Sequence, residues 1–176
     1  MLSRKEALQS GYSYRALSLK NITENGEVNL TNIENYFAVE PLKRNYFTHN
    51  DDVLLRLSSP YTAVIINEKE ENLLIPSHFA IIRVNKSVDP TYMYWWLTKN
   101  RKQFYKIASG GTIMGTISSG YIQEMDIELP SMEQQRKMGE LLKCANREQQ
   151  LLSLLAEKKR QLIGITLIKS INLGEI

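Results

Sequence analysis

The 176-residue chain contains very few of the residues from which common catalytic and metal sites are built. It has one cysteine, Cys144, and two histidines, His49 and His78. A single cysteine excludes an intramolecular disulfide, and three such ligands are too few for a four-ligand zinc site. Hydrophobic runs are far shorter than the ~20 residues that span a bilayer, and the first residues lack the apolar segment of a secretory signal. We therefore expect a cytoplasmic protein without a metal site.

Sequence motifs for nucleotide, cofactor and nucleophile chemistry are also missing. The chain has no G-x-x-x-x-G-K-[ST] phosphate loop, no G-x-G-x-x-G fingerprint and no G-x-S-x-G elbow. The run Asp89-Pro90-Thr91-Tyr92 is only loosely similar to the Asp/Asn-Pro-Pro-Tyr/Phe motif of amino-methyltransferases, because the second proline is absent. We interpret Asp89 as a helix N-cap and Pro90 as the first helical residue. The sequence thus predicts no catalytic residue and no cofactor.

Charge is balanced along most of the chain. Residues 1–128 hold 14 basic and 14 acidic side chains, and residues 129–176 hold 8 basic and 5 acidic ones, so the net charge of +3 resides in the C-terminal segment. A neutral N-terminal part has no strong overall field to attract a polyanion. If this part binds an anion, it must do so through local clusters rather than through its overall field.

Hydrophobic patterning divides the chain into a β-rich part and a helical part. Asn25-Gly26 is a strong hairpin signal, and residues 32–47 are polar and irregular. Short β-branched and alternating runs predict strands at residues 14–22, 27–30, 53–57, 62–67, 73–75, 79–84 and 125–129. Helical periodicity covers residues 90–108, with a break near Asn100. Residues 109–120 contain four of the nine glycines and are expected to form a loop.

A long helix is predicted from Met132 to Ile163. Ser131 and Gln134 match the S-x-x-Q capping box at its start, and 32 residues give a length of ~48 Å. A heptad pattern places the following residues on one stripe: Leu141, Ala145, Leu152, Leu155 and Leu162. Glu148 and Lys159 interrupt it. We expect an α+β fold whose last helix pairs as a coiled coil; a helix that packs on its own domain is the alternative.

The order of these parts resembles the specificity subunit of type I restriction–modification systems. The likeness covers about residues 12–165 and is carried by four stretches: YRALSLKNITENGEV, NDDVLLRLSSPYTAVII, PSHFAIIRVNKSVDPTYMYWWLTKN and ASGGTIMGTISSGYIQEMDIELPSMEQQRKMGELL. The last is the most specific, because it combines a glycine-rich loop, a short strand, an "LP…EQ" junction and a long spacer helix.

The resemblance implies a DNA-reading role without catalysis. It makes residues 1–130 a DNA target recognition domain and residues 131–176 a spacer and dimerisation helix with its tail. Partners would be double-stranded DNA, a methyltransferase subunit and in some systems a restriction subunit. Family members normally carry two recognition domains and two spacers, whereas this chain has one of each. It therefore resembles a half-subunit, whose homodimer would read a symmetric, interrupted site.

Base reading and phosphate binding require exposed polar groups on loops. We expect base contacts from two groups and one further residue: Arg44, Asn45 and Tyr46; Arg56, Ser58, Ser59 and Tyr61; and His78. We expect phosphate contacts from the glycine-rich loop and the basic run before it: Lys106, Ser109, Gly110, Gly111, Thr112, Thr116, Ser118 and Ser119. The alternatives are a salt bridge from Arg56 to Asp51 or Asp52, a structural His78, and a loop that only turns the chain.

Three other functions remain open from the sequence. One is a coiled-coil adaptor that does not bind DNA, which the neutral charge of residues 1–128 favours. Another is the recognition domain of a related modification enzyme. The third is a divalent-metal nuclease built from scattered acids, namely Asp51, Asp52, Glu68 and Glu70.

Overall fold

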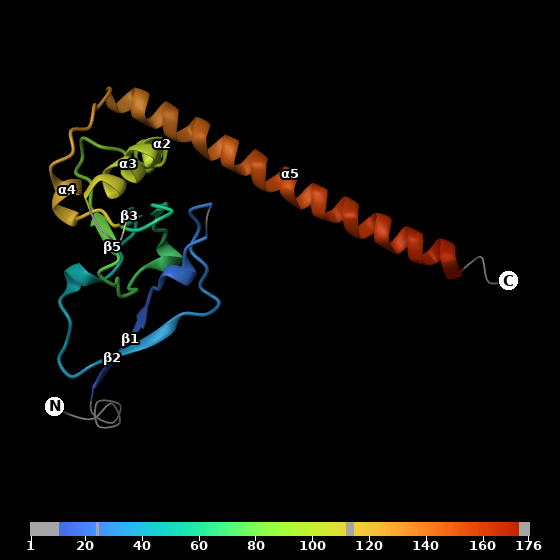
Figure 1. Ribbon diagram of the computed structural model, residues 1–176, viewed down its shortest axis with the longest axis horizontal. Helices are drawn as coiled ribbons and strands as arrows, with labels where there is room; N and C mark the ends of the chain where they lie inside the picture. Colours follow the sequence, from blue (N-terminus) through green and yellow to red (C-terminus); the bar gives the residue numbers. More distant parts are fainter. Residues whose placement is uncertain (1–10, 24, 112–114, 173–176) are drawn as a thin grey trace. The chain divides into compact units, whose positions relative to one another are not determined.

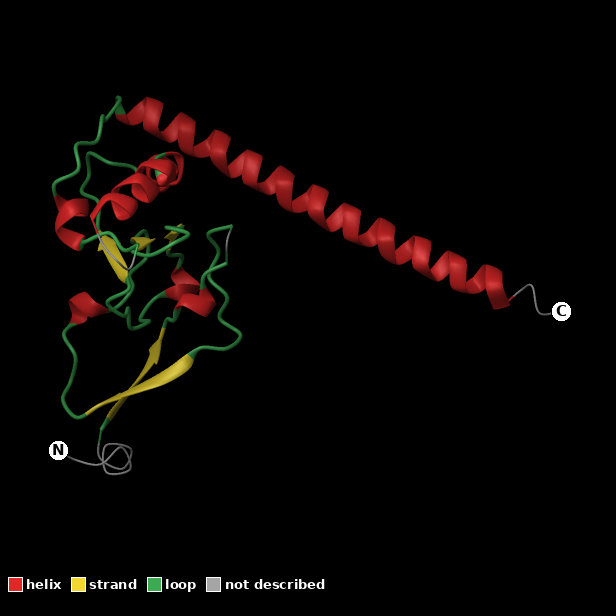
Figure 2. Cartoon of the chain, in the orientation of Figure 1, coloured by secondary structure: helices red, strands yellow, loops and turns green. Residues whose placement is uncertain are grey.

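A computed structural model describes residues 11–23, 25–111 and 115–172 of the chain. The chain divides into two compact units, residues 1–136 and residues 137–176. The first unit contains all the strands and short helices of the described part, and the second consists of most of one long helix (Figure 1). This is the predicted α+β fold with a long C-terminal helix (Figure 2).

A two-stranded antiparallel ribbon lies at one end of the first unit, drawn in blue in Figure 1. It is made of β1 (Tyr12–Ala16) and β2 (Glu34–Ala38). The predicted strand at residues 14–22 is therefore shorter, and it is followed by a 3₁₀ turn, η1 (Leu19–Asn21). The prediction that residues 32–47 are irregular was wrong for β2. Four of the five β2 residues are exposed, so the strand lacks the alternation of buried and exposed positions that marks a strand in sequence.

A three-stranded antiparallel sheet forms the centre of the first unit. Its order is β4 (Ala63–Ile65), β3 (Val53–Arg56) and β5 (Phe79–Ile82), and these three strands were predicted. Both faces of β3 are covered, which explains its continuous apolar sequence. Val53 and Leu55 pack in one core cluster with the helices, whereas Leu54 packs in a second cluster with Leu17.

Three short helices cover one side of this sheet. They are α2 (Pro90–Lys99), α3 (Arg101–Gly111) and α4 (Ser119–Gln123). The Asp89 carboxylate accepts hydrogen bonds from the backbone N–H groups of Thr91 and Tyr92, at 2.9 and 3.3 Å, which confirms the predicted N-cap. The predicted break near Asn100 is also confirmed.

Two predictions for the segment after α2 need correction. The predicted loop at residues 109–120 is shorter, because α3 continues to Gly111 and α4 begins at Ser119. Residues 125–129 form no strand. Their alternation has another cause: Met125 and Ile127 pack against the core cluster around β3, while Asp126 and Glu128 are exposed.

The long helix α5 (Met132–Asn172) has 41 residues and extends nine residues beyond its predicted end. The predicted capping box is present: the Gln134 side chain accepts from the Ser131 N–H at 3.1 Å, and the Ser131 hydroxyl accepts from the Gln134 N–H at 3.4 Å. The helix continues through Gly164 because one glycine costs only about 1 kcal/mol in a helix interior. Its neighbours Leu162, Ile163, Ile165 and Leu167 are apolar.

Candidate nucleic-acid interface

The turn after β3 brings several of the predicted site residues together. The Arg56 Nε donates to the Ser58 hydroxyl at 3.2 Å. Ser58 in turn forms a β-bridge with Thr116, next to a hydrogen bond of 2.8 Å from the Ile117 N–H to the Leu57 carbonyl. The structure thus places the 58–61 turn beside the end of the glycine-rich segment. We call this group, comprising Arg56, Ser58, Ser59 and Thr116, the turn cluster.

Tyr61 and Tyr105 contact each other and the segments that carry the turn cluster. Tyr61 is only 1% exposed, its hydroxyl donates to the Gly115 carbonyl, and its ring meets that of Tyr105 edge-on with centroids 4.8 Å apart. Burial raises the pKa of the Tyr61 hydroxyl above its usual value, and the neighbouring Tyr105 adds to this. The buried Tyr61 therefore holds residue 115 against the turn, while the exposed Ser59 and Thr116 face solvent. Sequence reasoning did not identify Tyr105. The only available signal was its position in a predicted helix, directly after Phe104, which the structure shows to be buried.

Arg56 does not form the salt bridge considered from the sequence. Asp52 is paired with Arg83, with 3.0 Å between the Arg83 Nε and the Asp52 carboxylate. The guanidinium of Arg56 is instead half-buried beside Ser58 at the end of β3. Its charge is therefore not neutralised by Asp51 or Asp52.

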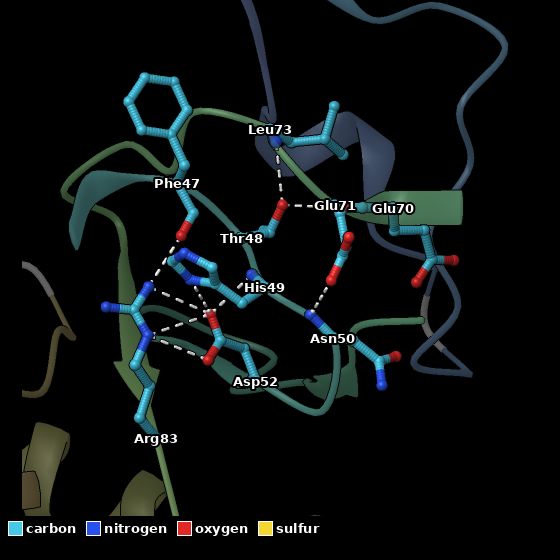
Figure 3. Close-up of polar contacts among 9 residues, drawn as sticks. All are labelled: Phe47, Thr48, His49, Asn50, Asp52, Glu70, Glu71, Leu73 and Arg83. Carbon is cyan, nitrogen blue, oxygen red and sulfur yellow. Dashed lines mark hydrogen bonds and ion pairs between the residues drawn. The ribbon is translucent and has the colours of Figure 1, made fainter. Parts of the chain in front are cut away.

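The Asp52–Arg83 pair belongs to a network that fixes the loop before β3 (Figure 3). The same carboxylate accepts from the His49 N–H at 2.9 Å, and Arg83 also donates to the Phe47 carbonyl at 2.7 Å. Thr48 is fully buried, and its hydroxyl donates to the Glu70 carbonyl at 2.6 Å. These contacts connect residues 47–52 with the 70–73 turn and with Arg83, which directly follows β5.

The predicted base-reading group of Arg44, Asn45 and Tyr46 lies in the 3₁₀ turn η2 (Arg44–Tyr46), and all three residues are exposed. Asn45 and Tyr46 line a groove of about 720 Å³ that runs along β5 to α4, where Ser119 also lines it. The backbone of η2 is held by a hydrogen bond of 2.9 Å from the Ile75 N–H to the Tyr46 carbonyl. The structure therefore brings Asn45, Tyr46 and Ser119 to one groove. The residues of the turn cluster do not line this groove.

The remaining predicted residues have mixed surroundings. His78 and Lys106 are exposed. The Ser109 hydroxyl donates to the Tyr105 carbonyl at 2.7 Å, and the Ser118 hydroxyl accepts from the Tyr121 N–H at 3.1 Å as the cap of α4. Gly110 and Gly111 belong to the last turn of α3, and Thr112 lies outside the described residues.

The predicted pairing stripe on α5 is exposed within the second unit. Leu141, Leu152, Leu155 and Leu162 are 50–71% exposed, and Ala145 is exposed as well. Five further apolar residues of the helix C-terminal to this stripe are also exposed: Ile163, Ile165, Leu167, Ile168 and Ile171. So much exposed apolar surface on one helix is more than a monomeric protein usually leaves in contact with solvent.

Two features of the described part of the chain concern metal binding and the membrane. No group of three or more His, Cys, Asp or Glu side chains in that part of the chain is arranged to hold a metal ion. Among the helices of the described part, none is both long and apolar enough to cross a membrane.

Comparison with known proteins places this architecture in a family. A comparison with curated proteins returned no significant match. The HsdS subunit from Thermoanaerobacter tengcongensis is similar in structure, with a TM-score of 0.62 and 18% identity, over 91% of this chain and 43% of that chain. A chain from a study of complex assembly and conformational transition of the type I R-M system has a TM-score of 0.64 and 15% identity, over 90% of this chain and 42% of that chain.

This chain thus spans about two-fifths of the length of the two solved chains, and at these identities the likeness shows the fold alone. The family model of the type I restriction modification DNA specificity domain matches residues 9–158, which is most of the sequence and includes the turn cluster, the groove and most of α5. The chain therefore belongs to the type I restriction modification DNA specificity domain family.

Proposed function

We propose that this chain is a sequence-specific DNA-binding half-subunit that directs a partner methyltransferase, and in some complexes a restriction subunit, to its target. Residues 1–130 would be the recognition domain and residues 131–176 the spacer. The observation that carries the proposal is the family match over residues 9–158. The chain has no motif for cofactor binding or nucleophile chemistry, so the base modification is assigned to the partner.

The turn cluster and the groove at η2 are the DNA contacts in this proposal. Ser59, Thr116 and the half-buried Arg56 offer donors at one surface, and the exposed Lys106 lies one residue after Tyr105, which contacts Ser59 at 3.5 Å. Hydroxyl and basic donors of this kind position a duplex through its phosphates. Arg44, Asn45 and Tyr46 offer the side chains suited to base edges, as does His78, while Ser109, Ser118 and Ser119 add hydroxyls.

Salt dependence of duplex binding tests the DNA role. Each phosphate contact makes the slope of log K against log salt more negative by about 0.9. Lys106→Ala should therefore make the slope less steep by about 1 and weaken binding to all sequences alike. Lys69→Ala is the matched control, because Lys69 is an exposed lysine in the 68–71 turn. Binding that is absent or insensitive to salt would favour the adaptor function instead.

We propose further that two copies pair through α5 and so place two recognition domains on a symmetric, interrupted site. The exposed stripe of Leu141, Ala145, Leu152, Leu155 and Leu162 supports this pairing, because apolar heptad positions are buried when helices form a coiled coil. A two-fold protein reads a two-fold site.

Solution mass by light scattering tests the pairing. The double variant Leu152→Asp with Leu155→Asp should convert a dimer to a monomer. Gln150→Asp with Ser153→Asp is the control, because these positions lie on the other side of the same helix and are exposed. A monomer for the unmodified chain would refute the homodimer, and the symmetric site with it.

A further inference from the structure

The ribbon formed by β1 and β2 presents two chemically different faces. Cross-strand partners share a face and successive residues alternate. Tyr12, Tyr14 and Tyr36 therefore lie on one face. The other face carries two cross-strand pairs, Arg15 with Asn35 and Ser13 with Phe37.

The tyrosine face attaches the ribbon to the rest of the first unit. The Tyr14 hydroxyl accepts from the Leu42 N–H at 3.1 Å, and the Tyr14 ring lies 5.1 Å from that of Phe47. The backbone of β1 is also tied to Leu74, whose N–H donates to the Arg15 carbonyl at 2.8 Å. These contacts lie on the backbone and on the tyrosine side, so they hold the ribbon without covering Arg15 or Asn35.

The second face is free over the described part of the chain. Ser13, Arg15 and Asn35 are exposed, and Phe37 is 39% exposed. Within residues 11–23, 25–111 and 115–172, the Arg15 guanidinium and the Asn35 amide make no hydrogen bond or ion pair. The Arg15 and Asn35 side chains thus lie directly opposite each other on the ribbon, and no described residue uses their hydrogen-bond donors.

These four side chains match the chemistry of base edges in the major groove. Arginine pairs with two acceptors of guanine, asparagine pairs with the acceptor and donor of adenine, serine bonds either, and phenylalanine packs on the thymine methyl group. The major groove is wide enough for a two-stranded ribbon.

We propose that the face of the ribbon carrying Ser13, Arg15, Asn35 and Phe37 reads bases in the major groove of the target duplex. Arg15 and Asn35 are its specificity-determining residues, and they read adjacent positions because they are cross-strand neighbours. This inference rests on the proposed DNA-binding function. It extends that function to a part of the chain in which sequence reasoning found no site.

The test is selection of bound duplexes from a pool with a randomised central segment, using the full chain. The unmodified protein gives a preferred sequence. Arg15→Ala and Asn35→Ala should each abolish preference at one base pair, with a loss of discrimination of about 5- to 150-fold there, and leave the other positions unchanged. Lys86→Ala, which removes one exposed charge from a turn elsewhere, should keep the whole preference. Thermal unfolding of each variant verifies that it is folded.

The other outcomes separate this inference from the function on which it rests. If Arg15→Ala weakens binding to all sequences equally, Arg15 binds phosphate and base reading by the ribbon is refuted. If both variants select the same sequence as the unmodified protein, the ribbon lies away from the bases, and the proposed function stands without it. If the unmodified protein selects no sequence, specific DNA binding itself fails, and this inference fails with it.

Discussion

Gln135 provides the most demanding test of how the first unit is held together. Its side chain is 1% exposed, although it is a polar residue in the first turn of α5. The Gln135 Oε1 accepts from the Asp89 N–H at 2.9 Å, and its Nε2 donates to the carbonyls of Ser87 and Pro130 at 3.1 and 2.9 Å. One side chain thus joins the first turn of α5 to the N-cap of α2. The informative perturbation is Gln135→Ala.

The magnitude follows from the three hydrogen bonds. Each contributes about 0.5–1.5 kcal/mol net, and a buried N–H left without a partner costs about 1–3 kcal/mol. The Asp89 N–H is part-buried and would lose this partner, so we expect a loss of about 3 kcal/mol in the free energy of unfolding. For a chain of this size the midpoint of thermal unfolding should fall by about 6–12 °C.

The measurement is urea and thermal unfolding at one protomer concentration, because association shifts the apparent stability. Gln134→Ala is the matched control: the same residue type, one position earlier, exposed, and engaged only in the capping box. It should cost about 1 kcal/mol. If Gln135→Ala costs no more than Gln134→Ala, the buried hydrogen bonds carry no net stability and the reasoning is wrong.

Three further predictions concern the first unit. Arg83→Leu leaves the buried Asp52 carboxylate without its ion pair; we expect a loss of about 2 kcal/mol, below that for a fully buried pair because Arg83 is partly exposed, measured by urea unfolding. Phe104→Ala empties a fully buried site and should cost about 3–5 kcal/mol in the same assay. Burial raises the pKa of Tyr61 and Tyr92, so their stabilising contribution should be constant below pH 10 and fall as the pH rises above it; a tyrosinate absorbance titration of the folded protein that shows every tyrosine ionising normally would contradict this.

The parts of the fold that were predictable from sequence are those with a strong local signal. The buried strands β3, β4 and β5 are recognisable in the sequence as short apolar runs. The N-terminal ends of α2 and α5 are marked by Asp89 and by Ser131 with Gln134. The signal is local because caps and buried runs depend on a few adjacent residues. Long-range partners do not have to be known.

The parts that were missed depend on contacts between distant residues. Strand β2 has no apolar periodicity because its partner β1 supplies the pairing and most of its side chains face solvent. The choice of Arg83 over Arg56 as the partner of Asp52 follows from the register of β3 and β5, which sequence separation does not reveal. Likewise, nothing in the run Glu133-Gln134-Gln135 tells which glutamine is buried, because that depends on the position of Asp89.

Under the proposed DNA-binding function, the charge balance of residues 1–128 affects how the chain would discriminate between DNA sequences. Non-specific DNA binding is almost entirely electrostatic, and residues 1–128 carry equal numbers of basic and acidic side chains. Attraction to an arbitrary duplex should therefore be weak, while contacts from Arg56, Arg15 and Asn35 act only at short range. A DNA-binding domain of this kind gains specificity by lowering the affinity for wrong sequences rather than by raising the affinity for the right one. In the proposed dimer, each recognition domain would bind weakly by itself. Joining two of them through α5 would then supply affinity that the neutral surface does not, because the second domain would bind at high effective concentration.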